Sequence, residues 1–550
     1  MTDTTVDGSA ARAHDWMSSA AKQRVRRRYR SDIRLQAFGI GAIAIAVGLL
    51  LTLFASLIHA GYAAFTTTKV NLSVHLDPTQ INREDPSSAN YRKIVFDAFQ
   101  SLFPDVTSPR DRRELRRIMS SGAPYIVRDF VIANPDKIGQ TVTIPVSLSD
   151  PYDQLNKGVI PRQIDALSPD RYVLFDRLKR RNVVAVKDDD AVVEIDAYID
   201  PAKVNSNDIA SGDFLSIVRE GFRAYFDRVN TVAYEEILAD NAPETLKSQV
   251  MAAPDSIGKT VRVALPLSEH YASLLKTGEA KMRNPRFSSD NDFVWFDSLK
   301  DRKLITTPFS WELFTNADSR FPELAGLAGA LVGSFLALLT CFLLSFPIGI
   351  ATAVYLEEFA PKNRWTDLIE VNINNLAAVP SVVFGLLGLA VFLGFFGLPR
   401  SAPLVGGMVL SLMTLPTIIV ATRAALKSVP PSIREAALGV GASKHQVMFH
   451  HVLPLAMPGI LTGTIIGLAQ ALGETAPLLL IGMNAFIPSI ENMGVLQPAM
   501  ALPTQIFAWA DSPERGFVSR TSAAILVLLG FLVVMNIIAV YLRQRLERKW

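Results

Sequence analysis

The sequence predicts a mainly α-helical membrane protein in which a polar α+β domain is inserted between the first and the second of six membrane spans. Of the 550 residues, 49% are hydrophobic and only 19% are charged, a balance typical of a chain with several apolar spans. Six apolar stretches each exceed the ~20 residues that cross a bilayer core. They lie at approximately residues 35–65, 324–354, 371–398, 402–425, 455–482 and 522–542. Residues 66–320, between the first two stretches, lack any long apolar run and are therefore expected to form a separate domain.

The N-terminal segment, residues 1–34, is polar and ends in a basic cluster directly before the first span. Such a cluster is found in proteins that bind nucleic acid or lipid, but its position favours a topology signal, and no nucleic acid is expected as a partner. The first span, 35–65, is longer than the ~7–15 residues of a signal-peptide core, so we interpret it as a retained transmembrane helix. The basic residues are Lys22, Arg24, Arg26, Arg27, Arg28, Arg30 and Arg34.

The polar domain, 66–320, contains an internal duplication. Three segments recur in the same order with small gaps: 70–78 aligns with 193–201, 133–142 with 252–261, and 172–179 with 293–300. The repeats therefore run from about 70 to 190 and from about 193 to 306. Each begins with alternating apolar residues, the pattern of a half-buried strand, and continues with helical stretches. We expect two α+β lobes that form a pseudo-symmetric pair.

Residues with enzymatic or metal-binding chemistry are not grouped in any familiar pattern. Gly258-Lys259-Thr260 resembles the end of a phosphate-binding P-loop, but Ala253 stands where the first glycine is required and no hydrophobic strand precedes it. The single cysteine, Cys341, lies in an apolar run and excludes a disulfide within the chain. The histidines lack metal-ligand spacing. We expect no catalytic residues, no metal site, no bound cofactor and no ATPase site in this chain.

The distribution of basic residues predicts the topology. Basic residues of the N-terminal segment, of the loops near 362–364 and 423–444, and of the tail near 543–549 fall on one side of the membrane. That side is the cytoplasm by the positive-inside rule. Both termini are then cytoplasmic, and residues 66–320 lie in the periplasm of a bacterial inner membrane protein. Residues 484–520 fall on the same outer side and are expected to fold back as a loop.

The loop between the fourth and fifth spans, 430–454, contains two helix starts in tandem. Ser432 with Glu435 has the spacing of a capping box, and so has Ser443 with Gln446. Gly439 and Gly441 lie between them and allow a tight reversal. Pro430 and Pro431 precede the loop, and Pro454 restricts the residue before it. The pattern predicts two short helices around a glycine hinge, outside the membrane.

This loop resembles the EAA loop of ABC-importer permeases, in which it forms the coupling helix that docks on a cytoplasmic ATPase. The residues that carry the resemblance are Glu435, Ala436, Ala437, Gly441, Leu453 and Pro454. The stretch 473–479, Gly-Glu-Thr-Ala-Pro-Leu-Leu, resembles phosphate-importer permeases of the PstA type. Two positions depart from the family pattern: His451 stands where an aliphatic residue is usual, and Gln470 where arginine is common.

The resemblance implies a type I ABC-importer permease fold for 321–550, with the periplasmic repeats as an additional domain. It implies a second permease of the PstC type, which completes a pore for phosphate in the lipid bilayer. It also implies an ATPase dimer of the PstB type that uses the ATP, and a periplasmic phosphate-binding protein of the PstS type. A permease for another oxyanion, such as sulfate, molybdate or phosphonate, is the nearest alternative. A membrane sensory protein is the alternative from another class, but only about eight residues follow the last span.

Four polar residues are candidates for the translocation path or its gate: Glu474, Thr475, Gln470 and Arg423. A carboxylate inside a span costs about 2.5 kcal/mol or more, so Glu474 should face a cavity or a partner. Gln470 lies one helical turn before it, on the same face. An alternative for Glu474 is a purely structural hydrogen bond between helices. An alternative for Arg423, and for Arg400, is a role as an anchor at the membrane interface.

Overall fold

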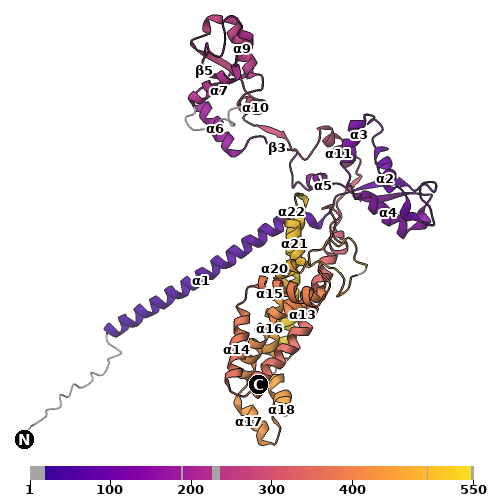
Figure 1. Ribbon diagram of the computed structural model, residues 1–550, viewed down its shortest axis with the longest axis vertical. Coiled ribbons are helices and arrows are strands. Elements are labelled where there is room, and N and C mark those ends of the chain that lie inside the picture. The colour runs from indigo at the N-terminus through magenta and orange to yellow at the C-terminus, as the bar shows by residue number, and fades with distance from the viewer. Residues whose placement is uncertain (1–18, 188–189, 226–235, 492, 547–550) are drawn as a thin grey trace, which may run out of the picture.

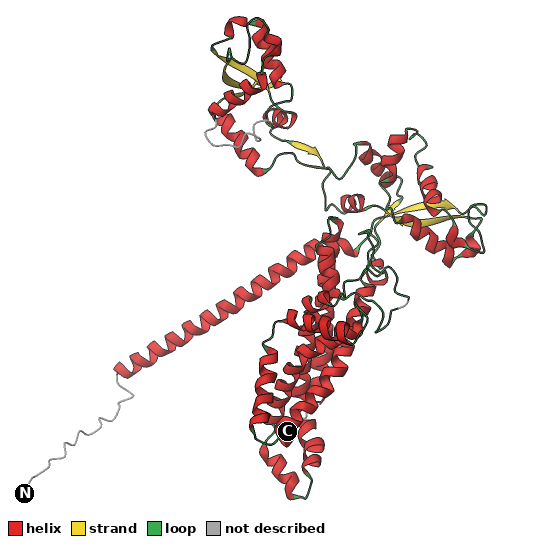
Figure 2. Ribbon diagram, viewed as in Figure 1, coloured by secondary structure: helices red, strands yellow, loops and turns green. Residues whose placement is uncertain are grey.

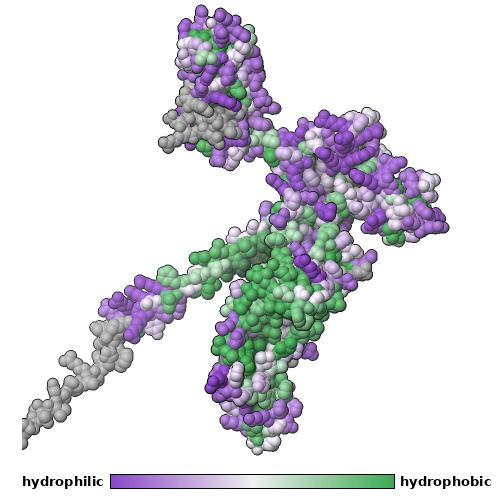
Figure 3. Space-filling view, in the orientation of Figure 1, coloured by the Kyte–Doolittle hydropathy of each residue, from purple (hydrophilic) through white to green (hydrophobic). Residues whose placement is uncertain are grey.

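The computed structural model describes residues 19–187, 190–225, 236–491 and 493–546, and it consists of a helical bundle, one diverging helix and a duplicated domain (Figure 1). Strands lie in the duplicated domain and in the ribbon that joins its two lobes, while the bundle is helical (Figure 2). In the face shown in Figure 3, hydrophobic residues cover the bundle and much of the diverging helix, and hydrophilic residues cover the duplicated domain. This division agrees with the composition boundary near residue 320.

Among the described residues, five helices are long and apolar enough to cross a membrane, and a bent helix pair brings the number to six. The first is the long helix α1, which diverges from the bundle and contacts it near its own C-terminal end (Figure 1). The five long helices are α1 (Ser19–Gly61), α13 (Ala328–Val354), α16 (Pro403–Ser428), α19 (Leu453–Gly473) and α22 (Gly516–Leu546).

The predicted span at 371–398 is part of a bent helix pair. Helix α14 (Arg364–Ala377) is followed by a second helical segment, Ser381–Phe395, which begins as α15 (Ser381–Leu387), and the two are bent by 106°. The physical cause is Pro380, which lacks a backbone N–H and disfavours helical geometry for Val379. The apolar character of the stretch predicts a span, but the proline divides it.

Small residues let the three central helices α13, α16 and α19 pack closely. A Cβ atom added to Gly407 would lie 2.4 Å from the Cβ of Thr340, and one added to Gly463 would lie 2.1 Å from the Cβ of Ala421. Within a bilayer, such close contacts supply much of the helix–helix attraction. These contacts also give the relative levels of the helices, because Gly463 of α19 lies opposite Ala421 of α16.

The duplicated domain has two lobes, each with a three-stranded antiparallel sheet covered by helices. The sheet orders are β2-β1-β8 in the first lobe and β4-β5-β6 in the second. The strands are β1 (Lys69–His75), β2 (Thr141–Ser147), β4 (Val184–Lys187), β5 (Asp190–Tyr198), β6 (Thr260–Pro266) and β8 (Ile305–Thr306). The helices include α2 (Tyr91–Gln100), α3 (Pro109–Arg116), α4 (Ala123–Ala133), α5 (Asp150–Asn156), α7 (Phe214–Tyr225), α9 (Ala242–Ala252) and α10 (Glu269–Thr277).

The two lobes do not coincide with the two sequence repeats, because the repeats exchange their last helix and strand. Helix α6 (Pro169–Arg180) belongs to the first repeat but packs in the core of the second lobe, and α11 (Asn291–Asp301) of the second repeat packs in the first. The equivalent strands β3 (Gln163–Asp165) and β7 (Lys281–Arg283) pair antiparallel between the lobes. Two α+β lobes are present as expected, but each lobe is completed by the last helix and strand of the other repeat.

A buried polar joint attaches the first lobe to the bundle. Arg520 of α22 is 4% exposed, and its Nη2 donates to the carbonyl oxygen of Glu323 at 3.1 Å. The Glu323 side chain is also buried and accepts a hydrogen bond from the hydroxyl of Ser120 in the first lobe. Nearby, Lys157 pairs with Asp153 at 2.6 Å and donates to the backbone just after α1. The joint thus links the first lobe, α1 and α22.

Candidate coupling and translocation site

The first helix of the predicted coupling loop is α17 (Pro431–Gly439), at the end of the bundle far from the duplicated domain (Figure 1). Its N-cap is Pro430, without a side-chain hydrogen bond, so the predicted capping box of Ser432 and Glu435 is wrong. The cause is Pro431, which occupies the first helical turn, where its missing N–H costs nothing. The helix therefore begins before Ser432, whose oxygen no longer lies at the cap.

The reversal after α17 occurs at Gly441, as the glycine pattern predicts. Gly441 has φ +89°, a left-handed conformation that favours glycine. Its N–H donates to the carbonyl of Leu438 at 2.9 Å. The second predicted capping box is present: Ser443 N–H donates to Gln446 Oε1 at 2.9 Å, and Gln446 N–H donates to Ser443 Oγ at 3.3 Å.

The sequence predicts a second short helix that lies outside the membrane. In the structure, this helix does not end before Pro454. Helix α18 (Lys444–Gln446) continues through the π-helical turn η8 (Val447–Val452) into α19, so that one helical span runs from Lys444 to Gly473. Leu453 and Pro454 lie in the first turn of α19. A proline ring collides with the carbonyl four residues earlier in a regular helix, and the wider π turn directly before Pro454 relieves that contact.

The exposed side of α17 forms a free surface at the tip of the bundle. Glu435 and Ala436 are exposed, whereas Ala437 is buried among apolar residues of the bundle. Two apolar side chains beside them are also exposed, Leu438 by 48% and Val440 by 87%. Glu435, Ala436, Leu438 and Val440 thus form a small mixed surface that a second protein can contact.

Six charged residues of α17 and of neighbouring elements form a cluster, here called the coupling-loop charge cluster: Glu357, Glu358, Glu370, Arg423, Lys427 and Arg434. Arg434 of α17 donates to Glu358 Oε1 at 3.0 Å and to the carbonyls of Leu426 and Val429 at 2.8 and 3.0 Å. Leu426 lies in the last turn of α16 and Val429 follows that helix as its C-cap, so Arg434 adds a donor at the helix end, where few backbone N–H groups are available. A cation there is also favoured by the helix dipole.

Arg423 of α16 supplies the second half of the cluster. Its Nε lies 3.2 Å from Glu357 and its Nη2 lies 2.8 Å from Glu370 of α14. Lys427 approaches Glu357 at 3.5 Å. Glu357 and Glu358 are consecutive residues of the π-helical turn η6 (Tyr355–Phe359) after α13, and they contact different helices. Three cations and three carboxylates balance within the cluster.

The carboxylates of this cluster were not among the sequence-predicted site residues. The available signal was the pair Glu357-Glu358 directly after an apolar span, where the helix dipole disfavours negative charge. Such a pair needs cations nearby, and the basic residues of the following loop are the obvious source. The sequence alone does not show which cation meets which carboxylate.

The remaining predicted residues lie at the other end of α19. Gln470 is exposed near the end of that helix, and Glu474 and Thr475 are half-buried where the helix breaks before α20 (Ala476–Leu480). The predicted span 455–482 is therefore interrupted between α19 and α20. The cause is Pro477, which has no N–H to donate to the carbonyl of Gly473.

Arg423 does not lie with Gln470, Glu474 and Thr475. Gly463 packs opposite Ala421 and Gly459 opposite Ala425, so Arg423 lies level with residue 461 in the first half of α19, whereas Glu474 follows the end of that helix. At 1.5 Å per residue, the two levels differ by roughly 20 Å along the helix. The structure thus separates a coupling site around α17 from a polar site around Glu474.

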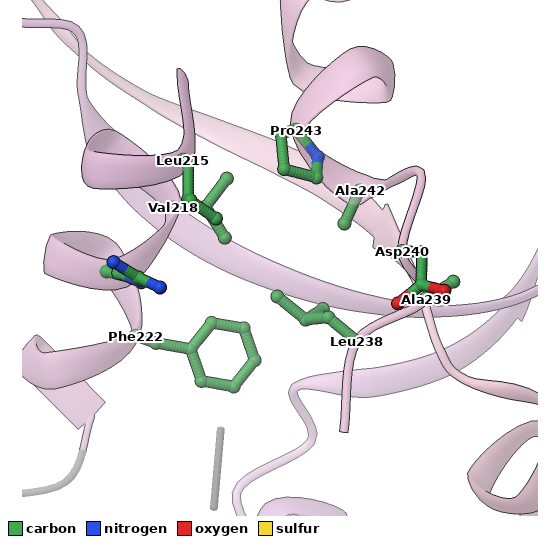
Figure 4. Close-up of a pocket in the computed structure, with 9 residues that line it drawn as sticks. Leu215, Val218, Phe222, Leu238, Ala239, Asp240, Ala242 and Pro243 are labelled. Atoms are coloured by element: carbon green, nitrogen blue, oxygen red, sulfur yellow. The ribbon is translucent and has the colours of Figure 1, made fainter. Parts of the chain in front are cut away.

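The second lobe contains a separate pocket of about 220 Å³ between α7 and α9 (Figure 4). The side chains of Leu215, Val218, Phe222 and Leu238 line it together with Pro243, and Asp240 lies at its edge. It contains none of the predicted site residues and lies in the duplicated domain, away from the bundle. Within the described residues, no group of three metal-ligating side chains is found.

Comparison with known proteins identifies both parts of the chain. Residues 345–548 match the family model "binding-protein-dependent transport system inner membrane component". The PstA 1 protein of Mycobacterium tuberculosis, a phosphate transport system permease, is 33% identical over 220 residues, which are 40% of this chain and 70% of that protein. The chain belongs to this permease family. Residues 22–166 and 189–285 match a domain of unknown function (DUF3333), which is the additional domain of this permease.

Other relatives give the same picture for the bundle. PstA of Yersinia pestis is 32% identical over 39% of this chain and 71% of its own length. The probable ABC transporter permease YqgI of Bacillus subtilis is 28% identical over 44% of this chain and 85% of its own. Among solved structures, the MetNI methionine ABC transporter matches with a TM-score of 0.32 and 16% identity, over 40% of this chain and 96% of that one. The family match, the PstA relatives and the apolar helices show that the protein is a multi-pass inner membrane permease.

Proposed function

We propose that this permease is a subunit of an ATP-driven phosphate importer, in which it forms half of the translocation pore. The observation that carries the proposal is the exposed helix α17, which presents Glu435 and Ala436 at the tip of the bundle and turns back at Gly441. A short helix with an exposed mixed surface is suited to dock in a groove of a partner. Phosphate is favoured over other oxyanions because the PstA relatives are named as phosphate permeases.

The proposed partners follow from the same family. A second permease of the PstC type completes the pore, a PstB-type ATPase dimer binds the coupling loop and uses the ATP, and a PstS-type binding protein delivers phosphate. This chain itself binds no cofactor. The coupling-loop end of the bundle is cytoplasmic, together with both termini, and residues 66–320 lie in the periplasm. The basic residues around the coupling loop support this orientation.

For the translocation path we propose Gln470, Glu474 and Thr475. Gln470 is exposed on the surface of a membrane-spanning helix, and a polar amide there needs water or a partner protein. The pore between two permeases supplies both. A carboxylate is a poor direct ligand for phosphate, so Glu474 acts as a gate or holds a cation. Arg423 contributes at the coupling-loop end, where it is already paired with two carboxylates.

The proposal is tested by affinity purification of the full chain from its native membrane. The expected result is a complex with a P-loop ATPase and a second permease, which takes up radiolabelled phosphate into proteoliposomes when its binding protein and ATP are present. Unlabelled sulfate, molybdate or phosphonate should not compete. Competition by one of them at equal concentration would reassign the substrate, and a complex without an ATPase would refute the importer. A cysteine introduced into residues 66–320 should react with an impermeant reagent from the periplasmic side only.

A further inference from the structure

The coupling-loop charge cluster joins four elements that are far apart in the sequence. Arg434 connects α17 with the ends of α16 and α13, and Arg423 connects α16 with α13 and α14. The ion-paired side chains of Arg423 and Arg434 are 21% and 23% exposed, and those of Glu357 and Glu358 are 18% and 24% exposed. Ion pairs with this degree of burial are screened less by salt than surface pairs.

Helix α14 has little other attachment to the bundle. None of its side chains is buried, and its main packing partner is α16. Among the described residues, Glu370 is the one charged residue of α14 that forms an ion pair, and its partner is Arg423. The bend at Pro380 separates α14 from α15, which packs mainly against α20 and also contacts α16. The ion pair of Glu370 with Arg423 therefore adds a polar attachment to the packing of α14 against α16.

We propose that the coupling-loop charge cluster is the mechanical link through which α17 positions α14 when the partner ATPase moves. This inference rests on the proposed function, because it takes the ATPase as the source of the movement. It assigns Arg434, Glu358, Arg423 and Glu370 as positioning residues for transport. The bend at Pro380 makes α14 the part of this span that can move separately.

The geometry of the arginines suits such a link. The guanidinium of Arg434 is planar, and its two terminal nitrogens contact the end of α16 and Glu358 at the same time, which an ammonium group on a flexible chain does not reproduce. A displacement of α17 is thus passed to α16 and to the end of α13. Arg423 is bonded in a similar way to Glu357 and Glu370, so a displacement of α16 is passed to α14.

The test uses a cysteine reporter on α14 in the complete complex. The only native cysteine, Cys341, is buried, so Asn375→Cys on the exposed surface of α14 supplies a single reactive thiol. Its alkylation rate is measured with and without ATP, together with ATP hydrolysis. In the reporter protein, ATP should change the alkylation rate. With Glu370→Gln or Arg434→Lys added, this change should shrink about fivefold or more, while hydrolysis continues.

A double-variant comparison separates a link from general loosening. If Glu358 and Arg434 act through one contact, Glu358→Gln combined with Arg434→Gln should be no worse than the more damaging single variant. As a control, Asp176→Asn removes an exposed ion pair with Arg180 in α6 and should leave the ATP response unchanged. An unchanged ATP response in both Glu370→Gln and Arg434→Lys would overturn the proposal, as would multiplicative effects in the double variant.

The readouts do not depend on the substrate. If the complex hydrolyses ATP and the reporter responds, the link is tested even if another oxyanion is the substrate. If no ATPase binds the chain, the proposed function is refuted, and the link is refuted with it because it has no source of movement. The absence of the ATPase from the purified complex distinguishes this result from a failure of the link alone.

Discussion

At the scale of single residues, Gly441 has a backbone conformation that strongly favours glycine over other residue types. Its φ of +89° strains any other residue by about 1–2 kcal/mol, although an added Cβ would meet no atom within 4 Å. Gly441→Val should therefore stay in the membrane but lose transport and co-purify with less ATPase. Gly530→Ala, in an open helical position of α22, is the control. Normal uptake by Gly441→Val would contradict the role of the loop in coupling.

Glu474 is the second residue whose chemistry can be tested by itself. Glu474→Gln keeps most hydrogen bonds but removes the charge, so a gate or cation site should lose transport, while a structural carboxyl should not. We expect uptake to fall by at least about tenfold, which corresponds to ~1.4 kcal/mol on the rate-limiting barrier. Glu474→Asp should retain partial activity. The measurement is phosphate uptake per assembled complex, and a wild-type rate in Glu474→Gln would make the carboxylate structural.

At the scale of elements, the exchange of the last helix and strand between the repeats predicts which strands can be crosslinked. Val70 of β1 lies opposite Ile305 of β8, and Val193 of β5 lies opposite Val184 of β4. Opposed residues of antiparallel strands are about 4.5–5.5 Å apart between Cα atoms, which suits a disulfide. The pair Val70→Cys and Ile305→Cys should crosslink within one chain on oxidation.

The matched control is the pair Val70→Cys and Val184→Cys. These two positions would be opposite each other if each repeat formed its own lobe, so in the exchanged arrangement the two thiols should remain reduced. Mass spectrometry of the proteolysed protein distinguishes the two results. The native Cys341 is buried and should not take part in crosslinking. A crosslink between 70 and 184, with none between 70 and 305, would show that each repeat forms its own lobe.

At the scale of the whole molecule, the buried joint between the first lobe and the bundle predicts a pH dependence. Burial raises the pKa of Glu323, which lies before the span α13, to about 7, with Asp150 as a further unfavourable charge and Ser120 and Arg520 as favourable neighbours. The folded protein then binds a proton that the unfolded chain releases near pH 4.5. The contribution of protonated Glu323 to the free energy of unfolding is therefore fully present below about pH 4.5 and is lost as the pH rises toward about 7.

The expected difference is about 2 kcal/mol of unfolding free energy between pH 5.5 and pH 8. It is measured as a thermal or denaturant midpoint of the purified protein in detergent at the two pH values. Glu323→Gln keeps a neutral hydrogen-bonding side chain and should remove most of the difference. An equal pH dependence in Glu323→Gln would mean that other groups in the joint, such as Asp150, cause it.

Much of the architecture could be predicted from the sequence, because it depends on local composition and spacing. The five long spans, the polar domain between the first two, the duplication, the turn at Gly441 and the cap of Ser443 all follow from periodicity, hydropathy and backbone preference. The motif around Glu435 and the stretch after Gly473 indicated the permease family, which the comparisons confirm.

Only the tertiary structure decided how these parts meet. The exchange of α6 and α11 between the lobes was hidden, because equivalent segments have the same pattern and either pairing buries the same side chains. The partners of Glu358, Glu370, Arg423 and Arg434 were hidden because ion pairs connect residues that lie far apart in the chain. Hydropathy specifies what is buried, whereas contacts between distant elements depend on the geometry with which the whole chain packs.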